Sequence, residues 1–190
     1  MKRTPVLAAA GVLAAALELT GAGSPAFAGG PQYNDKAQLL FPANYREWIF
    51  LSSGLGMNYG PLAAKEGEDP NFDNVFVEPS AYRGFLQTGR WPDQTMLVIE
   101  VRASQSKGSI NKAGHYQGEV QGTEVEVKDE QRFPGKWAFF THQNGAAVAK
   151  LRPTSDQCYS CHAEHGAVDN TFVQFYPTLL SVAKEKGTLK

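Results

Sequence analysis

The feature that most constrains this chain is a short motif near its C-terminus, Cys158-Tyr159-Ser160-Cys161-His162. Its C-x-x-C-H pattern is the attachment signal for a c-type haem. Two cysteines at this spacing can reach the vinyl groups of one porphyrin, and the histidine that follows can bind the iron as an axial ligand. The motif therefore predicts one covalent haem c, held by Cys158 and Cys161, with His162 as the proximal iron ligand.

Two other uses of a C-x-x-C pair are possible. A structural zinc site needs two further ligands, and the sequence of 190 residues contains no third cysteine. A redox dithiol of the thioredoxin type needs no histidine after its second cysteine and usually opens a helix after a strand. The dithiol stays open as the alternative, but haem attachment accounts for the cysteines and the histidine together.

The first 28 residues have the pattern of a secretory signal peptide. A basic start is followed by the apolar segment Val6–Leu19 and by Ala26-Phe27-Ala28, a small-x-small cleavage site. A membrane anchor is disfavoured because the apolar segment is shorter than the about 20 residues that span a bilayer and contains Glu18. We therefore expect an exported, periplasmic protein in which residues 29–190 form a single haem-binding domain, with no membrane span after cleavage.

The middle of the chain predicts an α+β fold. Its strand-like segments are rich in β-branched and aromatic residues, and in Thr123–Lys128 polar residues alternate with Val125 and Val127, which we expect to point inward. Helical patterns frame these segments, so an antiparallel sheet framed by helices is expected, with the haem-attachment helix near the C-terminus. The formal net charge of −1 and the lack of a basic stripe give no indication of nucleic-acid binding. The strand-like segments are 72–77, 94–103, 115–120, 123–128 and 137–140.

The late position of the motif narrows the class of haem protein. Small electron-transfer cytochromes of class I carry the motif near the N-terminus and use a later methionine as second ligand, but no methionine follows His162 here. The strand character of the chain argues against a four-helix cytochrome c′. The other histidines, His115, His142 and His165, are expected to be hydrogen-bonded or exposed. We therefore expect a five-coordinate iron that binds a ligand or substrate, and disfavour a plain electron carrier.

An ordered set of segments makes the chain similar to the cytochrome P-460 / cytochrome c′-beta family. The resemblance covers nearly all of the chain after the signal segment. The matching segments are Asn44 to Trp48, Val75 to Tyr82, Val127 to Asp129, Arg132-Phe133, Trp137 to Phe140, Cys158 to His162, and Phe172 to Pro177.

This resemblance implies a periplasmic, mostly β-sheet protein with one haem, which forms a homodimer. In cytochromes P-460 a lysine is bonded to the porphyrin, and the enzyme oxidises hydroxylamine with or without nitric oxide and passes electrons to an acceptor such as another cytochrome. In cytochromes c′-beta that bond is absent, and an apolar distal face capped by phenylalanine binds nitric oxide or carbon monoxide. Oxidation of hydroxylamine or nitric oxide is therefore the expected function, and gas binding without catalysis is the alternative.

Three kinds of position bear on that choice. By position in the family, Lys107 is the first candidate for a cross-link to the haem, and Lys112 is the second. Arg46 is a candidate contact of a haem propionate, and a surface salt bridge would explain it equally well. Aromatic residues of the central segments are candidates for the distal pocket, with Phe72 or Phe76 as the expected cap; these are Phe72, Phe76, Phe133, Phe139 and Phe140.

The catalytic base is not identified by the sequence. Oxidation of hydroxylamine needs a nearby group that takes up protons. Around Phe133–Lys136, where a carboxylate above the iron is expected, the chain has none. Whether the protein is an enzyme or a gas-binding protein therefore stays open at this point.

Overall fold

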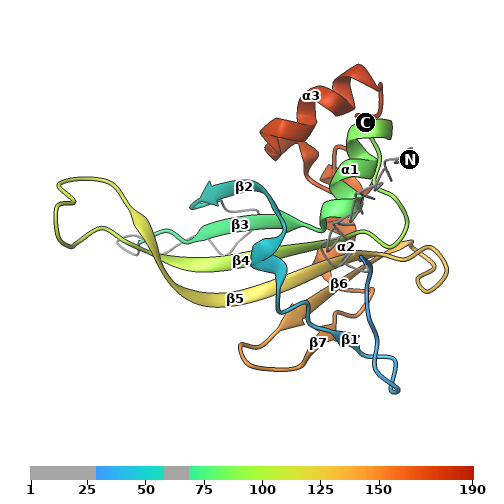
Figure 1. The fold of residues 1–190 in the computed structure, drawn as a ribbon, viewed down its shortest axis with the longest axis horizontal. Helices are drawn as coiled ribbons and strands as arrows, with labels where there is room; N and C mark the ends of the chain where they lie inside the picture. The colour runs from blue at the N-terminus through green and yellow to red at the C-terminus, as the bar shows by residue number, and fades with distance from the viewer. Residues whose placement is uncertain (1–28, 58–68) are drawn as a thin grey trace, which may run out of the picture.

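The computed structural model describes residues 29–57 and 69–190, and the predicted signal peptide lies outside them. Its centre is a seven-stranded antiparallel sheet in the order β1-β7-β6-β5-β4-β3-β2 (Figure 1). Three α-helices accompany the sheet in this part of the chain, and the one that carries the cysteines lies near the C-terminus. The predicted α+β architecture is therefore confirmed. Among the described residues, no helix combines the length and the apolar character that a membrane span requires.

The five predicted strand-like segments all lie in the sheet, and three further strands, at 39–40, 49–55 and 148–151, were not predicted. The predicted segments 115–120 and 123–128 form one strand, because Gly122 between them pairs with Val101. Pro177 begins the last helix, as suits a proline at a first helical position. The strands are β1 Leu39–Leu40, β2 Ile49–Leu55, β3 Phe72–Val77, β4 Met96–Gln105, β5 Tyr116–Lys128, β6 Trp137–His142 and β7 Val148–Leu151. The helices are η1 Tyr45–Glu47, α1 Pro79–Thr88, α2 Gln157–His165, η2 Val173–Phe175 and α3 Pro177–Glu185.

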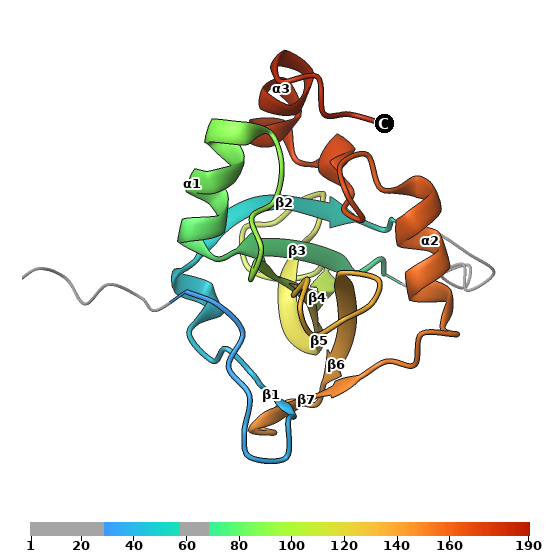
Figure 2. The same ribbon diagram turned by 90° about the vertical axis from the view of Figure 1, so that its right-hand side faces the viewer.

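Both faces of the sheet are covered, by different parts of the chain. The helical face, which includes Val77 and Leu97, packs against α1, η2 and α3. The N-terminal face, which includes Val98 and Val125, packs against the segment around β1 and η1. Figure 2 shows the three helices on one side of the sheet and the N-terminal segment on the other. Because successive side chains of a strand alternate between faces, β3, β4 and β6 contribute to both cores.

Helix α1 anchors the helical face. The Glu78 side chain caps its first turn by accepting hydrogen bonds from the backbone N–H groups of Ser80 and Ala81. Gly89 ends the helix in the left-handed conformation, at φ 70°, that glycine adopts without strain. Phe85 is fully buried 4.4 Å from the ring of Trp91, and such burial contributes about 2 kcal/mol.

Candidate functional site

Helix α2 presents both cysteines and the histidine of the motif. Asp156 stands at its N-cap and pairs with Arg152 at 2.5 Å, which fixes the entry of the chain into the helix. Cys158 and Cys161 are three residues apart and so share one side of the helix. Both are partly exposed, and neither forms a disulfide. The two thiols are therefore available for bonds to a group that lies along this side of α2.

The imidazole of His162 is held in one orientation. It lies between the rings of Phe139 on β6, at 4.4 Å, and Phe172, at 4.5 Å. Its Nδ1 lies 2.7 Å from the backbone carbonyl of Asn170. Because a carbonyl only accepts hydrogen bonds, Nδ1 carries the proton and donates it. Nε2 is then left with a free lone pair, the form in which histidine binds a metal.

A buried carboxyl group lies beside that nitrogen. Glu126, on the helical face of β5, places Oε1 3.6 Å from His162 Nε2. The residue is 5% exposed, and its Oε2 has no hydrogen-bond partner among the described residues. Burial raises the pKa of the Glu126 carboxyl; His162 opposes the rise and Glu124 adds to it. A buried carboxyl oxygen without a donor costs stability, so the position of Oε2 calls for a reason.

Two more acids share this face of the sheet. Glu124 is two residues from Glu126 on β5, and Asp73 lies on β3. The side chain of Glu124 reaches solvent, although partial desolvation by the surrounding protein still raises its pKa. Burial, with a smaller effect of Glu124, raises the pKa of Asp73 to about 6. The acids thus extend from a buried position beside His162 to one in contact with water.

These residues fit a c-type haem. Cys158 and Cys161 offer two unbonded thiols on one side of α2, and His162 offers a free Nε2. The rings of Phe139 and Phe172 supply apolar surface beside the imidazole. The unpaired oxygen of Glu126 is the kind of buried polar atom that a bound group or its ligand would engage.

Apart from Phe139, the structure does not bring the predicted distal phenylalanines together with His162. Phe76 packs on the N-terminal face, 5.5 Å from the ring of Tyr45. Phe133 lies 6.2 Å from Phe140 in the same cluster. Phe72 is four residues before Phe76 on β3 and so points to the same face. The physical reason is the alternation of β3, which directs Asp73 rather than its neighbours toward the helical face.

Lys107 and Arg46 also lie away from His162. Lys107 is exposed in the turn between β4 and β5, where its carbonyl accepts a hydrogen bond from Tyr116. This turn, which also contains Lys112, projects from the end of the sheet opposite α2 (Figure 1). Arg46 donates to the carboxylate of Glu100 at 2.9 Å on the N-terminal face. The position of Arg46 therefore suits an ion pair within the fold.

The other histidines have local partners, as expected from the sequence. His142 stacks on Phe41 at 3.5 Å and bonds Thr123, both on the N-terminal side. His115 lies 3.3 Å from Ser104 near the end of the β4–β5 hairpin. His165 shares helix α2 with His162 and is 60% exposed.

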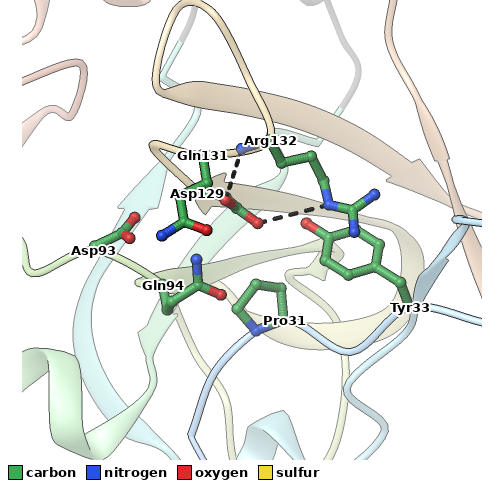
Figure 3. Close-up of a pocket in the computed structure, with 7 residues that line it drawn as sticks. All are labelled: Pro31, Tyr33, Asp93, Gln94, Asp129, Gln131 and Arg132. Carbon is green, nitrogen blue, oxygen red and sulfur yellow. Dashed lines mark hydrogen bonds and ion pairs between the residues drawn. The ribbon is translucent and has the colours of Figure 1, made fainter.

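A surface pocket of about 610 Å³ lies elsewhere on the molecule (Figure 3). The guanidinium of Arg132 sits 3.8 Å from the ring centre of Tyr33 and pairs with Asp129. Burial and the Asp129 carboxylate raise the pKa of Tyr33 to about 12, although Arg132 opposes them. No residue of the motif lines this pocket, so it is separate from the His162 site. The lining residues are Pro31, Tyr33, Asp93, Gln94, Asp129, Gln131 and Arg132.

Comparison with known proteins gives one family. The sequence model of the family described as Cytochrome P460 matches residues 42–173, a range that contains the whole C-x-x-C-H motif, Glu126 and Asn170. A search of curated proteins gives no match.

Proposed function

The chain belongs to the cytochrome P460 family, and on this basis we propose that it is a periplasmic c-type haem oxidoreductase that oxidises hydroxylamine or nitric oxide. The family implies haem c, and Cys158, Cys161 and His162 are the residues that would hold it. The observation that carries the choice of an oxidoreductase is the buried carboxyl of Glu126, whose Oε1 lies 3.6 Å from His162 Nε2 and whose Oε2 has no hydrogen-bond partner among the described residues.

The reaction explains why a carboxyl group is needed there. Oxidation of hydroxylamine to nitroxyl releases two protons and two electrons, so a base must take up the protons. When bound, haem supplies an iron that binds the substrate nitrogen and takes up its electrons. The electrons then pass to an external acceptor, for which another periplasmic cytochrome is the expected partner.

Glu126 has the position and the environment of that base. Burial raises the pKa of its carboxyl, which makes it a stronger proton acceptor than an exposed glutamate once it is ionised. Glu124 lies two residues farther along the same face and reaches solvent. A proton taken up at Glu126 can therefore pass by way of Glu124 to water.

A second candidate function is supported by Lys107. Its position on the turn that projects away from α2 favours a haem held by thioether bonds alone. In the family that this chain resembles, absence of the lysine bond goes with binding of nitric oxide or carbon monoxide. A Glu126 carboxyl kept protonated by its raised pKa would leave an uncharged site, which suits such neutral ligands.

The test uses the purified holoprotein with hydroxylamine and an artificial electron acceptor. Glu126→Gln keeps the shape of the side chain and removes the base, so the turnover rate should fall about 10²- to 10⁴-fold. Glu124→Gln should cost less, and Glu185→Gln, at an exposed position on α3, should cost nothing. A wild-type rate in Glu126→Gln would overturn the proposal.

The same preparations separate the two functions. Wild-type protein that binds nitric oxide reversibly but does not turn over hydroxylamine would establish the gas-binding alternative. The absorption spectrum of the reduced protein reports on the lysine bond, because a Soret band shifted far to the red indicates an altered porphyrin. An ordinary ferrous high-spin spectrum in the wild type, unchanged in Lys107→Ala, would support the gas-binding alternative.

A further inference from the structure

The carbonyl that orients His162 belongs to a tight turn. Val168 and Thr171 face each other across two backbone hydrogen bonds, of 3.0 Å and 3.4 Å, with Asp169 and Asn170 between them. Asp169 adopts the left-handed conformation at φ 50°, which aspartate tolerates better than most residues. The Asn170 carbonyl takes no part in the pair and accepts the hydrogen bond from His162 Nδ1 at 2.7 Å. The orientation of the imidazole therefore depends on where this turn sits.

Two buried groups from other parts of the chain hold the turn. The indole N–H of Trp91 donates to the hydroxyl of Thr171 at 2.7 Å, and Thr171 is fully buried. The ammonium of Lys128, at the end of β5, lies 3.5 Å from the Asp169 carboxylate and donates to the carbonyl of Trp91 at 2.7 Å. The side chain of Lys128 is only 10% exposed. These contacts tie the turn to the strand that also carries Glu126.

Gly166 shows how closely the turn packs on the helix of the iron ligand. A Cβ atom at this position would lie 2.6 Å from the carbonyl oxygen of His162 and 2.9 Å from the carbonyl carbon of Asn170. Both neighbours are backbone atoms, so they cannot swing aside as a flexible side chain would. The C-terminus of α2 and the turn are therefore in direct contact, and a shift of one must displace the other.

A hydrogen bond from Nδ1 to a carbonyl changes how strongly the imidazole donates electrons to a metal. It draws the Nδ1 proton away from the ring, and this makes Nε2 a stronger donor to iron. The strength of that effect depends on the distance and angle of the acceptor. An ion pair that fixes the acceptor therefore acts on the iron through the histidine.

From these contacts we propose that Lys128 and Asp169 are positioning residues that set the donor strength of His162 by holding the Asn170 carbonyl in place. This rests on the part of the proposed function that makes His162 the iron ligand, and not on the identity of the substrate. Both residues lie outside the Cys158–His162 motif, and no sequence pattern indicates that they pair.

Resonance Raman spectroscopy of the reduced, substrate-free holoprotein tests the proposal. Asp169→Asn keeps the size of the side chain and its tolerance of the left-handed conformation but removes the charge. It should lower the frequency of the iron–histidine stretching band and raise the reduction potential, because a weaker donor disfavours ferric iron. Lys128→Met keeps the apolar stem and should shift both quantities in the same direction.

The matched control uses the same lysine. Glu130 also lies 3.4 Å from Lys128 Nζ, but its side chain is 39% exposed and its other ion pair is with Lys136. Glu130→Gln should therefore leave the stretching band and the potential at wild-type values. Asp169 also lies 3.6 Å from Arg90, a contact that Asp169→Asn alone removes. In the double variant Lys128→Met/Asp169→Asn the shift should still be smaller than the sum of the two single shifts, since both changes remove the Lys128–Asp169 pair.

An unshifted band in Asp169→Asn would overturn the proposal even if the variant is less stable, because the pair would then serve the fold alone. If Lys128→Met does not fold, Asp169→Asn decides by itself. The readout needs no hydroxylamine, so a protein inactive toward hydroxylamine that still shows the shift would contradict the proposed function and support this inference.

Discussion

Two buried glutamates on neighbouring strands have opposite surroundings. Glu100 on β4 faces the N-terminal side and is 2% exposed; Glu126 on β5 faces the helices and is 5% exposed. The carboxylate of Glu100 accepts hydrogen bonds from Tyr45, Arg46 and Arg102, whereas Oε2 of Glu126 has no partner among the described residues. Burial alone would raise the pKa of Glu100, but the bonds from these donors lower it to about 2, while burial raises that of Glu126.

The difference separates a glutamate that serves the fold from one that is available for the proposed reaction. A buried carboxylate that is fully supplied with donors adds stability and holds its neighbours in place. One without donors costs stability, and it is retained where its proton is used. Equal burial of the same residue type therefore says little by itself, and the hydrogen-bond partners decide the role.

The largest effect should come from removing the satisfied glutamate. Glu100→Gln takes charge-assisted hydrogen bonds from Arg46 and Arg102, and Arg102 is only 24% exposed, so the free energy of unfolding should fall by about 2 to 3 kcal/mol. Glu126→Gln should change it by less than about 1 kcal/mol, because no hydrogen-bonded charge is lost. Urea unfolding of the holoproteins, with Glu185→Gln as the exposed control, measures both. Equal losses of unfolding free energy in the two variants would show that the two glutamates contribute alike to stability.

The pH dependence of stability should separate the two residues next. The pKa of Glu100 is lowered from 4.5 to about 2 in the folded protein. Its contribution to stability is therefore fully present above about pH 4.5 and is lost as the pH falls toward 2. Glu100→Gln should flatten the stability curve across this range by up to about 2 kcal/mol. Parallel stability curves of the wild type and the variant between pH 4.5 and 2 would contradict the lowered pKa of Glu100.

The motif predicts Cys158, Cys161 and His162, but the sequence did not identify the buried Glu126 beside them, for one physical reason. Cysteine and histidine spacing depends on local helix geometry, so Cys158, Cys161 and His162 follow from the motif alone. The alternation in Thr123–Lys128 correctly placed Val125 and Val127 inside, but it assumed that the opposite face was open to water. Because helices cover that face as well, Glu126 is buried too. The sequence pattern of charged residues alternating with valine is the same whether one face or both faces of the strand are covered.

The aromatic residues show a related limit. Phe72, Phe76 and Phe133 were predicted to line the haem site, but the first two alternate with Asp73 on β3 and so point to the N-terminal face. Phe139 and Phe172, which contact His162, come from segments far apart in the chain and share no spacing pattern. Which face of a sheet receives a distant helix depends on tertiary packing, and periodicity alone does not record it.

Asp73 gives a smaller test of the helical face. Its pKa is raised from 3.8 to about 6, mainly by burial. A raised folded-state pKa means that the folded protein holds the proton more tightly, so stability should be lost as the pH rises from about 4 to about 6. The side chain is only half-buried, and the change should not exceed about 1 kcal/mol. Asp73→Asn should abolish this slope, measured by thermal unfolding at a series of pH values, and an unchanged slope would contradict the assignment.

The smallest effect on stability is expected for Arg46. Its variant tests whether Arg46 serves the ion pair with Glu100 or contacts the haem. Its side chain is 55% exposed, and Arg102 and Tyr45 still bind Glu100 when it is removed. Arg46→Ala should therefore cost about 1 kcal/mol or less in unfolding free energy. Because Glu100 points away from α2, the reduction potential and the absorption spectrum of the haem should not change. A shifted potential in this variant, with stability preserved, would instead support the propionate contact predicted from the sequence and place the N-terminal face within reach of the cofactor.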